Sequence, residues 1–212
     1  MTIVESPSRP TQEAMAEPPA PSEQELIYEW FREQYWTEAA FFAVSDATNR
    51  RIELSDGRLV ILPMPTLDHQ RILKRFVDLV TAWLATHKVG ELLFAAHPIR
   101  LWPGKYREPD AMICLNEHRD RMGEQESGPP DLALEILSPA IARVDSDLKS
   151  QEYAQAGIGE YWMIDPKARR VSVFTLEGRA YKLLGDFGSG ERARSNILTG
   201  LEVAVDDLFR VE

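Results

Sequence analysis

The strongest sign of chemistry in this sequence is a glutamate inside an apolar segment. Glu135 lies between Leu134 and Ile136, where a carboxylate would be partly shielded from water. Leaving it unpaired there would cost on the order of several kcal/mol, unless its pKa rises or a cation joins it. Its same-face neighbours in a strand, Ala133 and Leu137, are apolar, so a solvent-facing strand side explains Glu135 less well than a functional role.

Asp110 and Lys149 could complete a site around Glu135. Asp110 begins the preceding apolar segment, and two adjacent antiparallel strands would place it within reach of the same ion if the register allows. The alternative for Asp110 is a turn-forming aspartate. Lys149 lies in a helical segment four residues after Asp145, so its alternative is an ordinary surface ion pair. Tyr153, one turn later, indicates that this helix face is partly buried.

Two carboxylates and one ammonium together suit the hydrolysis of a phosphodiester. Carboxylates hold hard cations such as Mg²⁺ or Mn²⁺ through oxygen. The cation lowers the pKa of a bound water and offsets the charge that develops on the phosphate. A nearby ammonium can orient that water or stabilise the transition state. These residues therefore predict Asp110 and Glu135 as metal ligands, with Lys149 as the third catalytic residue.

The elements that must position these residues follow from the hydrophobic pattern. Residues 51–63 read as a hairpin around a Ser-Asp-Gly turn, and apolar residues at helical spacing predict a long helix over 67–87. The other expected elements are strands at 91–102, 109–115 and 131–137, a helix at 145–156, and strands at 160–165, 171–176 and 179–184, before a Gly-rich loop at 185–190. This order predicts an α/β sandwich with a mixed sheet, which the hairpin and the late strands would extend.

The start of the chain has a different composition from the rest. Residues 1–22 are rich in Pro, Ser, Glu and Ala and have few large apolar groups, so we expect a disordered tail. Large apolar residues recur at helical spacing within 23–49, which predicts a helical extension. Residues 50–212 would then form the domain that carries the site.

Composition and charge narrow the class of protein. The net charge is −10, from 24 basic and 34 acidic side chains, which argues against nonspecific coating of nucleic acid but permits a local basic rim. The single cysteine, Cys114, excludes an internal disulfide and argues against a zinc cluster. No apolar run is long enough to span a membrane, and the first residues lack the pattern of a secretion signal. We therefore expect a cytoplasmic protein.

Four segments resemble the Uma-type family of putative restriction endonucleases, within the PD-(D/E)XK nuclease superfamily. They are IELSDGRLVILPMPTLDHQ at 52–70, REPDAM at 107–112, LALEILSP at 132–139 and DSDLKSQEYAQAGIGEYWMIDP at 145–166. Their order and spacing also match, and the resemblance covers about residues 50–207. It implies a restriction-endonuclease-like core with a mixed central sheet flanked by helices, a Mg²⁺ or Mn²⁺ cofactor, and DNA as the partner.

The resemblance also assigns the site residues. Asp110 corresponds to the Asp of the PD element and Glu135 to the acidic residue of the (D/E)XK element. The superfamily places a lysine two residues after that acidic residue, but Leu137 stands there in this chain. Lys149, on the following helix, matches a lysine that has moved in this family.

Three further residues match recurrent family positions and are possible accessory members of the site. They are Glu53 in the hairpin, His69 at the start of the long helix, and Asp145 one turn before the catalytic lysine. The alternative for Glu53 is a charge at the hairpin edge, and the alternative for His69 is an ordinary helix-start residue.

The sequence leaves three functions open. The leading one is a metal-dependent DNA endonuclease. The second is a catalytically inactive interaction module on a nuclease scaffold, which Leu137, the negative net charge and the five tryptophans would suit. It should show a large exposed apolar patch and a cleft with no positive rim. The third is an enzyme acting on a small phosphate ester through a narrow cleft. A homodimer is also possible, because a duplex has two strands to cut.

Overall fold

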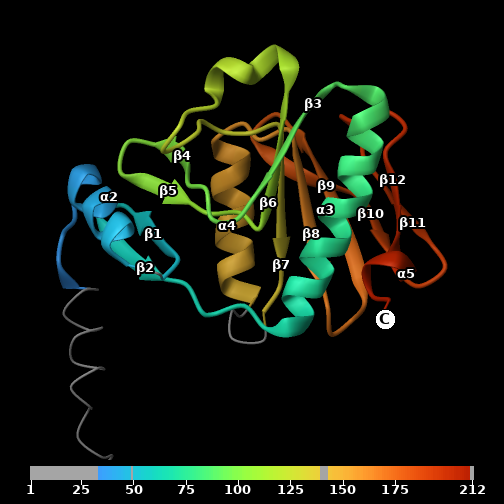
Figure 1. Cartoon of the computed structure of the whole chain (residues 1–212), viewed down its shortest axis with the longest axis horizontal. Helices are drawn as coiled ribbons and strands as arrows, with labels where there is room; N and C mark the ends of the chain where they lie inside the picture. The colour runs from blue at the N-terminus through green and yellow to red at the C-terminus, as the bar shows by residue number, and fades with distance from the viewer. Residues whose placement is uncertain (1–32, 49, 139–142, 211–212) are drawn as a thin grey trace, which may run out of the picture.

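A six-stranded mixed sheet forms the centre of the computed structural model, which describes residues 33–48, 50–138 and 143–210 (Figure 1). In spatial order its strands are β10 (Ala180–Phe187), β9 (Arg170–Glu177), β8 (Glu160–Asp165), β7 (Leu132–Ile136), β6 (Ala111–Leu115) and β3 (Gly90–Phe94). β7 and β8 run parallel, whereas the other neighbouring pairs of this sheet are antiparallel. The predicted mixed α/β architecture is confirmed.

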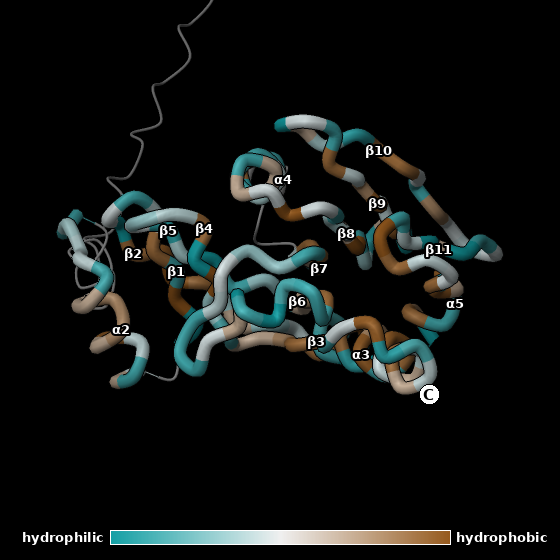
Figure 2. The backbone as a smooth tube through the Cα atoms, turned by 90° about the horizontal axis from the view of Figure 1, so that it is seen from above, coloured by the Kyte–Doolittle hydropathy of each residue, from teal (hydrophilic) through white to brown (hydrophobic). Residues whose placement is uncertain are grey.

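The long helix α3 (Leu67–His87) covers one face of this sheet (Figure 2). It begins after Thr66, whose hydroxyl accepts a backbone N–H of the first turn, and it ends at Lys88 in the left-handed conformation. Its buried apolar residues recur every three or four positions, and Phe76 packs edge-on against Trp162 of β8. Helical periodicity and a capping threonine therefore account for the agreement with the predicted bounds of 67–87.

The helix α4 (Arg143–Gln155) covers the opposite face (Figure 2). Its Tyr153 packs edge-on against Tyr161 of β8, in an apolar cluster that includes Ala133 of β7. Successive residues of a strand point to opposite faces, so Glu135, two positions after Ala133, also points toward α4. The alternation along β7 is thus what delivers this carboxylate to the helix that carries the lysine.

A second sheet of four strands lies beside the central one. Its spatial order is β2 (Arg58–Ile61), β1 (Ile52–Ser55), β5 (Lys105–Arg107) and β4 (Ile99–Trp102). The helix α2 (Glu38–Ala47) packs on this sheet through Phe41, which contacts the ring of Tyr106. The hairpin at 51–63 is therefore confirmed, but the prediction that it extends the central sheet is wrong.

The prediction of a single strand over 91–102 is also wrong. The chain leaves the central sheet after Phe94 and enters the second sheet at Ile99, so this segment supplies both β3 and β4. Pro98 lies just before the new strand, and a proline has no N–H to donate to a ladder. The short strand β5 was not predicted, and it follows a turn at Gly104.

The remaining elements complete the chain. They are the 3₁₀ helix η1 (Asn116–Arg121), the strands β11 (Arg192–Arg194) and β12 (Glu202–Ala204), which pair with each other, and α5 (Val205–Leu208). β10 continues through the start of the loop predicted at 185–190, with a register shift next to Gly185. The predicted tail at 1–22 lies outside the described residues, as does much of the predicted extension at 23–49, where α2 is the described helix. No described helix is both long and apolar enough to cross a membrane.

Candidate active site

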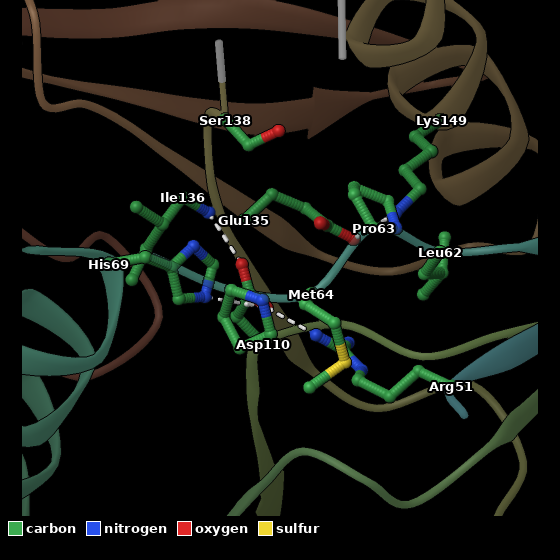
Figure 3. A pocket seen from close by; sticks show the side chains of 11 residues that line it. Arg51, Leu62, Pro63, Met64, His69, Asp110, Glu135, Ile136, Ser138 and Lys149 are labelled. Atoms are coloured by element: carbon green, nitrogen blue, oxygen red, sulfur yellow. Dashed lines mark hydrogen bonds and ion pairs between the residues drawn. The ribbon is translucent and has the colours of Figure 1, made fainter. Parts of the chain in front are cut away.

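Asp110 and Glu135 lie opposite each other at one edge of the central sheet. β6 and β7 pair Ala111 with Leu134, so the residue before Ala111 and the residue after Leu134 continue the same register. Directly opposite residues of an antiparallel pair have Cβ atoms about 4.5–5.5 Å apart. Asp110 is 3% exposed and Glu135 is 9% exposed. β6 and β7 therefore pair in the register that brings Asp110 and Glu135 together. Figure 3 shows both carboxylates in one pocket.

Glu135 accepts two donors from α4 on the same oxygen. Lys149 Nζ lies 3.0 Å from Glu135 Oε1, and the Tyr153 hydroxyl donates to that oxygen at 2.6 Å. Burial raises the pKa of Glu135 to about 7, because the contact with Lys149 only partly offsets the loss of water and the nearby Asp110 and Glu53 raise it further. Glu135 can therefore hold or release a proton near neutral pH.

Asp110 has the opposite electrostatic character. Its Oδ2 accepts the backbone N–H of Ile136 at 2.8 Å, and its Oδ1 accepts Arg51 Nη1 at 3.2 Å. Burial alone would raise the pKa of Asp110, but His69, the Ile136 N–H and Arg51 together outweigh burial and lower it. Two neighbouring carboxyl groups with opposite pKa shifts are typical of acid–base and metal sites.

His69 reaches this pocket from the first turn of α3. Its Nε2 lies 3.2 Å from Asp110 Oδ1, and its side chain is 9% exposed. The Nε2–Oδ1 pair has an ion-pair distance without the alignment of a hydrogen bond, and neither ring nitrogen has a hydrogen-bond partner in the part of the chain that the structure describes. The ordinary helix-start alternative for His69 does not explain a buried ring with two unsatisfied nitrogens.

Lys149 points into the protein from α4. It is 3% exposed, and its Nζ lies 3.0 Å from Glu135 Oε1 and 3.3 Å from Glu53 Oε1. The alternative of a surface ion pair is therefore wrong for Lys149. Asp145 falls near the start of α4, where the side chains lie outside the described residues, so its accessory role stays a prediction.

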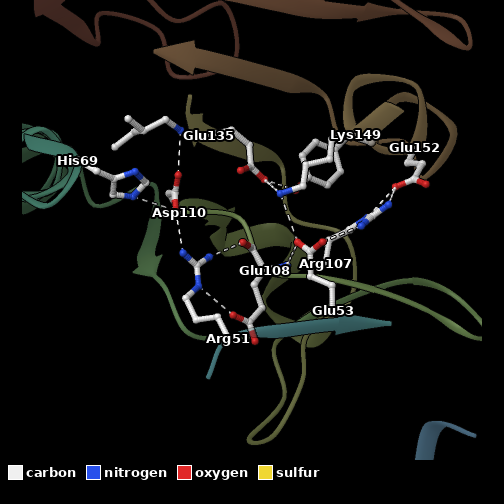
Figure 4. A network of polar contacts seen from close by, with 11 residues as sticks. Arg51, Glu53, His69, Arg107, Glu108, Asp110, Glu135, Lys149 and Glu152 are labelled. Atoms are coloured by element: carbon white, nitrogen blue, oxygen red, sulfur yellow. Dashed lines mark hydrogen bonds and ion pairs between the residues drawn. The ribbon is translucent and has the colours of Figure 1, made fainter. Parts of the chain in front are cut away.

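Glu53 belongs to a buried ionic network behind the pocket (Figure 4). It is 1% exposed, so the hairpin-edge alternative is wrong. Arg107 Nη1 donates to Glu53 Oε2 at 2.6 Å, and Arg107 Nε donates to Glu152 Oε2 at 2.7 Å. Burial would raise the pKa of Glu53, but Lys149 and Arg107 outweigh it and keep the pKa low. Glu53 thus contacts the same ammonium of Lys149 that contacts Glu135.

Sequence reasoning did not select Arg51, Arg107 or Glu152, although all three hold the site together. Arg51 also bonds Glu108, with Nε 3.1 Å from Oε2. Each contact joins segments far apart in the chain, so local periodicity carries no sign of it. One local signal existed: Glu152 follows Lys149 by three positions, which places both on one helix face.

The pocket itself is small. Its volume is about 30 Å³, and its lining includes Arg51, His69, Asp110, Glu135 and Lys149. A site of this size has room for a water or an ion. A substrate phosphate would therefore lie at the mouth of the pocket and not inside it.

The residues of this pocket fit a hydrated divalent cation. Among the residues that the structure describes, no three His, Cys, Asp or Glu side chains form a cluster that would hold a metal on its own. Mg²⁺, however, keeps several waters and is commonly bound through one or two carboxylates. Asp110 and Glu135 supply these carboxylates, and the unsatisfied nitrogens of His69 lie beside them.

The raised pKa of Glu135 predicts a pH-dependent affinity for a divalent cation. Below pH 7 the ion must displace a proton from Glu135, whereas Asp110 is already ionised. We expect the Mn²⁺ affinity to rise about tenfold per pH unit from pH 5 to pH 7 and to level off above it. Titration calorimetry at pH 5, 6, 7 and 8 measures this. A constant affinity across that range would contradict the assignment of Glu135.

Comparison with known proteins agrees with this architecture. Residues 37–206 match the model of the Uma2 family, described as "Putative restriction endonuclease". The crystal structure of a putative nuclease belonging to DUF820 from Anabaena variabilis is similar, with a TM-score of 0.64 and 19% sequence identity over 76% of this chain and 91% of that chain. At that identity the likeness shows a shared fold. No curated protein matches the chain. Because the family match spans most of the sequence, the chain belongs to the Uma2 family of putative restriction endonucleases.

Proposed function

We propose that this protein is a divalent-metal-dependent endonuclease that hydrolyses DNA phosphodiester bonds. The observation that carries the proposal is the meeting of Asp110, Glu135 and Lys149 in one buried pocket, from two strands and a helix. Membership in the family supports a nuclease function in general. The metal, its ligands and DNA as substrate are parts of the proposal.

Each residue of the pocket has a physical role in this reaction. Asp110 and Glu135 would hold Mg²⁺ or Mn²⁺, with His69 beside them, and the bound cation would supply an activated water and offset charge on the phosphate. His69, the Ile136 N–H and Arg51 together keep Asp110 ionised against the effect of burial. Lys149 places an ammonium beside Glu135, where it can orient a water or stabilise negative charge.

Two residues act by positioning the others. The Tyr153 hydroxyl donates to Glu135 Oε1 and so restricts the orientation of that carboxylate. Glu53, whose own position is held by Arg107, contacts the ammonium of Lys149 at 3.3 Å. Preorganised groups of this kind stabilise developing charge without rearranging during the reaction.

The two other functions fit less well. The narrow pocket of about 30 Å³ also suits a small-ester enzyme, so membership in a family of putative restriction endonucleases is what favours DNA as the substrate. For an inactive interaction module, the absence of lysine at Leu137 was one of three arguments, beside the net charge and the five tryptophans, and this one is met by Lys149, which supplies an ammonium to the same carboxylate. A homodimer stays a prediction.

The test of the proposal is cleavage of plasmid and single-stranded DNA by the wild-type protein with Mg²⁺ or Mn²⁺. We expect cleavage that requires the ion and stops with a chelator. Absence of cleavage together with absence of Mn²⁺ binding would contradict the proposal and favour the interaction module. Mn²⁺ binding without cleavage would retain the metal site and reject the substrate.

Asp110→Asn tests the metal site without relying on cleavage. The change removes the carboxylate that is ionised at neutral pH, so we expect the Mn²⁺ affinity to fall roughly 10- to 100-fold. Calorimetry at pH 7.5 measures the affinity, and circular dichroism checks the fold. Asp120→Asn on η1, an exposed site, is the matched control and should bind Mn²⁺ like the wild type. Equal affinities for the two variants would remove Asp110 from the site.

A further inference from the structure

A groove lined by arginines lies next to the candidate active site. Its volume is about 140 Å³, and its charged lining residues are Asp68, Arg71, Arg169 and Arg210, with Phe209 on its apolar side. All three arginines are exposed. The groove is formed by the first turn of α3, the turn after β8, and the residues that follow α5.

The groove and the active-site pocket share the first turn of α3. Asp68 lines the groove, and the next residue, His69, lines the pocket. α5 packs against α3 and lies beside the lower half of that helix in Figure 1. β8 is adjacent to β7, and neighbouring strands are about 4.8 Å apart. Met163 of β8 pairs with Glu135, and the turn residues that line the groove follow Met163 by three to six positions, so at about 3.3 Å per residue they lie roughly 10–20 Å from Glu135.

Positive charge dominates this groove. Three arginines face a single lining carboxylate, Asp68, whose Oδ1 is 3.5 Å from Arg71 Nη1. Asp206 on the neighbouring α5 accepts the Ser189 hydroxyl at 2.7 Å and the Gly190 N–H at 2.9 Å, and it also interacts electrostatically with Arg169 without lining the groove. The chain as a whole has a net charge of −10, so this local excess of cations is opposite to the average surface.

Arg169 has a backbone that holds its side chain over the groove wall. Its φ is +53°, in the left-handed region that a non-glycine residue seldom occupies. Its guanidinium lies 5.2 Å from the ring centre of Phe209, and Nη2 donates to the Phe209 carbonyl at 3.4 Å. The stacked guanidinium is thus partly ordered before any ligand arrives, which lowers the entropy lost on binding.

We propose that this arginine groove binds backbone phosphates of the DNA strand on one side of the scissile bond. Guanidinium groups match the geometry of phosphate oxygens and bind them without reading sequence. At about 3.4 Å per nucleotide along the axis, a separation of roughly 10–20 Å corresponds to about three to six nucleotides. The inference rests on the proposed function for its substrate, and it adds the direction in which the strand leaves the active site.

The test is DNA binding by the variant that combines Arg71→Ala, Arg169→Ala and Arg210→Ala. Fluorescence anisotropy of a labelled 20-base-pair duplex, without metal and over a range of NaCl concentrations, measures affinity and its salt dependence. We expect the affinity to fall at least tenfold, and the slope of log K against log salt to fall by about 2 to 3, since each phosphate contact contributes about 0.9. Arg119→Ala on η1, beyond the opposite end of β6, is the matched control and should bind like the wild type.

The outcomes separate this proposal from the proposed function. Binding that is lost in the combined variant and retained in Arg119→Ala supports the groove, whether or not the wild type cleaves DNA. Three outcomes would overturn the proposal that the groove binds DNA. They are unchanged binding by the combined variant, equal weakening of binding by Arg119→Ala, and absence of binding by the wild type. Cleavage by the wild type would leave the proposed function standing in the first two of those cases.

Discussion

Glu135→Gln is expected to reduce metal-dependent DNA cleavage by about 10³-fold or more. The substitution keeps the size of the side chain and an oxygen that can accept from Lys149 and Tyr153, but it removes the negative charge. Initial rates on plasmid DNA with saturating Mn²⁺ measure the effect. Glu117→Gln on η1 makes the same chemical change at an exposed site and should retain the wild-type rate.

The same variant carries its own check that the protein folds. The pKa of Glu135 is raised from 4.5 to about 7 in the folded protein. Because this pKa is higher in the folded than in the unfolded protein, protonation of Glu135 stabilises the fold. The stabilisation is fully present below the unfolded pKa of 4.5 and is lost as the pH rises through about 7. A difference of 2.5 pKa units corresponds to about 3 kcal/mol. Relative to the wild type, Glu135→Gln should therefore gain stability between pH 5 and pH 8 in urea unfolding. A DNA-cleavage rate of Glu135→Gln equal to that of the wild type would show that the reaction does not use this carboxylate.

The sheet and its long helix could be predicted because their signals are local. The run of apolar residues at helical spacing and the threonine before it set the bounds of α3, and the short apolar run at 131–137 placed Glu135 on a strand. The boundary between the two sheets could not be predicted in the same way. Residues 91–102 continue as a largely apolar segment across Pro98, and only the pairing of Ile99 with Arg107 shows that the second half joins another sheet.

The residues of the site that were predicted have local sequence signals, whereas most of the residues that were missed do not. Asp110 and Glu135 follow from their place on adjacent strands, which sequence order can indicate. Arg107, by contrast, joins β5 to β1 and α4 through contacts spanning 45 and 54 residues. The burial of an arginine between two distant glutamates leaves no helical or strand periodicity in the sequence around it. Only the position of charged residues within apolar segments indicates that such a network exists.

Lys149→Met tests whether a lysine on α4 does the work that the superfamily usually gives to the position of Leu137. The Lys149 ammonium lies 3.0 Å from Glu135 and 3.3 Å from Glu53, so methionine removes a cation from a buried cluster of carboxylates. We expect the maximal cleavage rate to fall roughly 10²- to 10³-fold. Lys149 lowers the pKa of Glu135, so the acidic limb of the pH–rate profile should move to higher pH. Rates from pH 6 to pH 9 measure both effects.

The shift in the pH profile separates a role in the reaction from a role in folding. A loss of packing alone would lower the amount of active protein without moving the profile. The companion variant adds Leu137→Lys to Lys149→Met. Leu137 is two residues after Glu135, just past the end of β7, and its backbone N–H donates to the Ile164 carbonyl at 2.8 Å. Side chains two positions apart in an extended chain point to the same face. A lysine there would again point toward the face of Glu135, so part of the lost rate should return. Wild-type activity in Lys149→Met, with an unshifted profile, would show that the reaction does not use this ammonium.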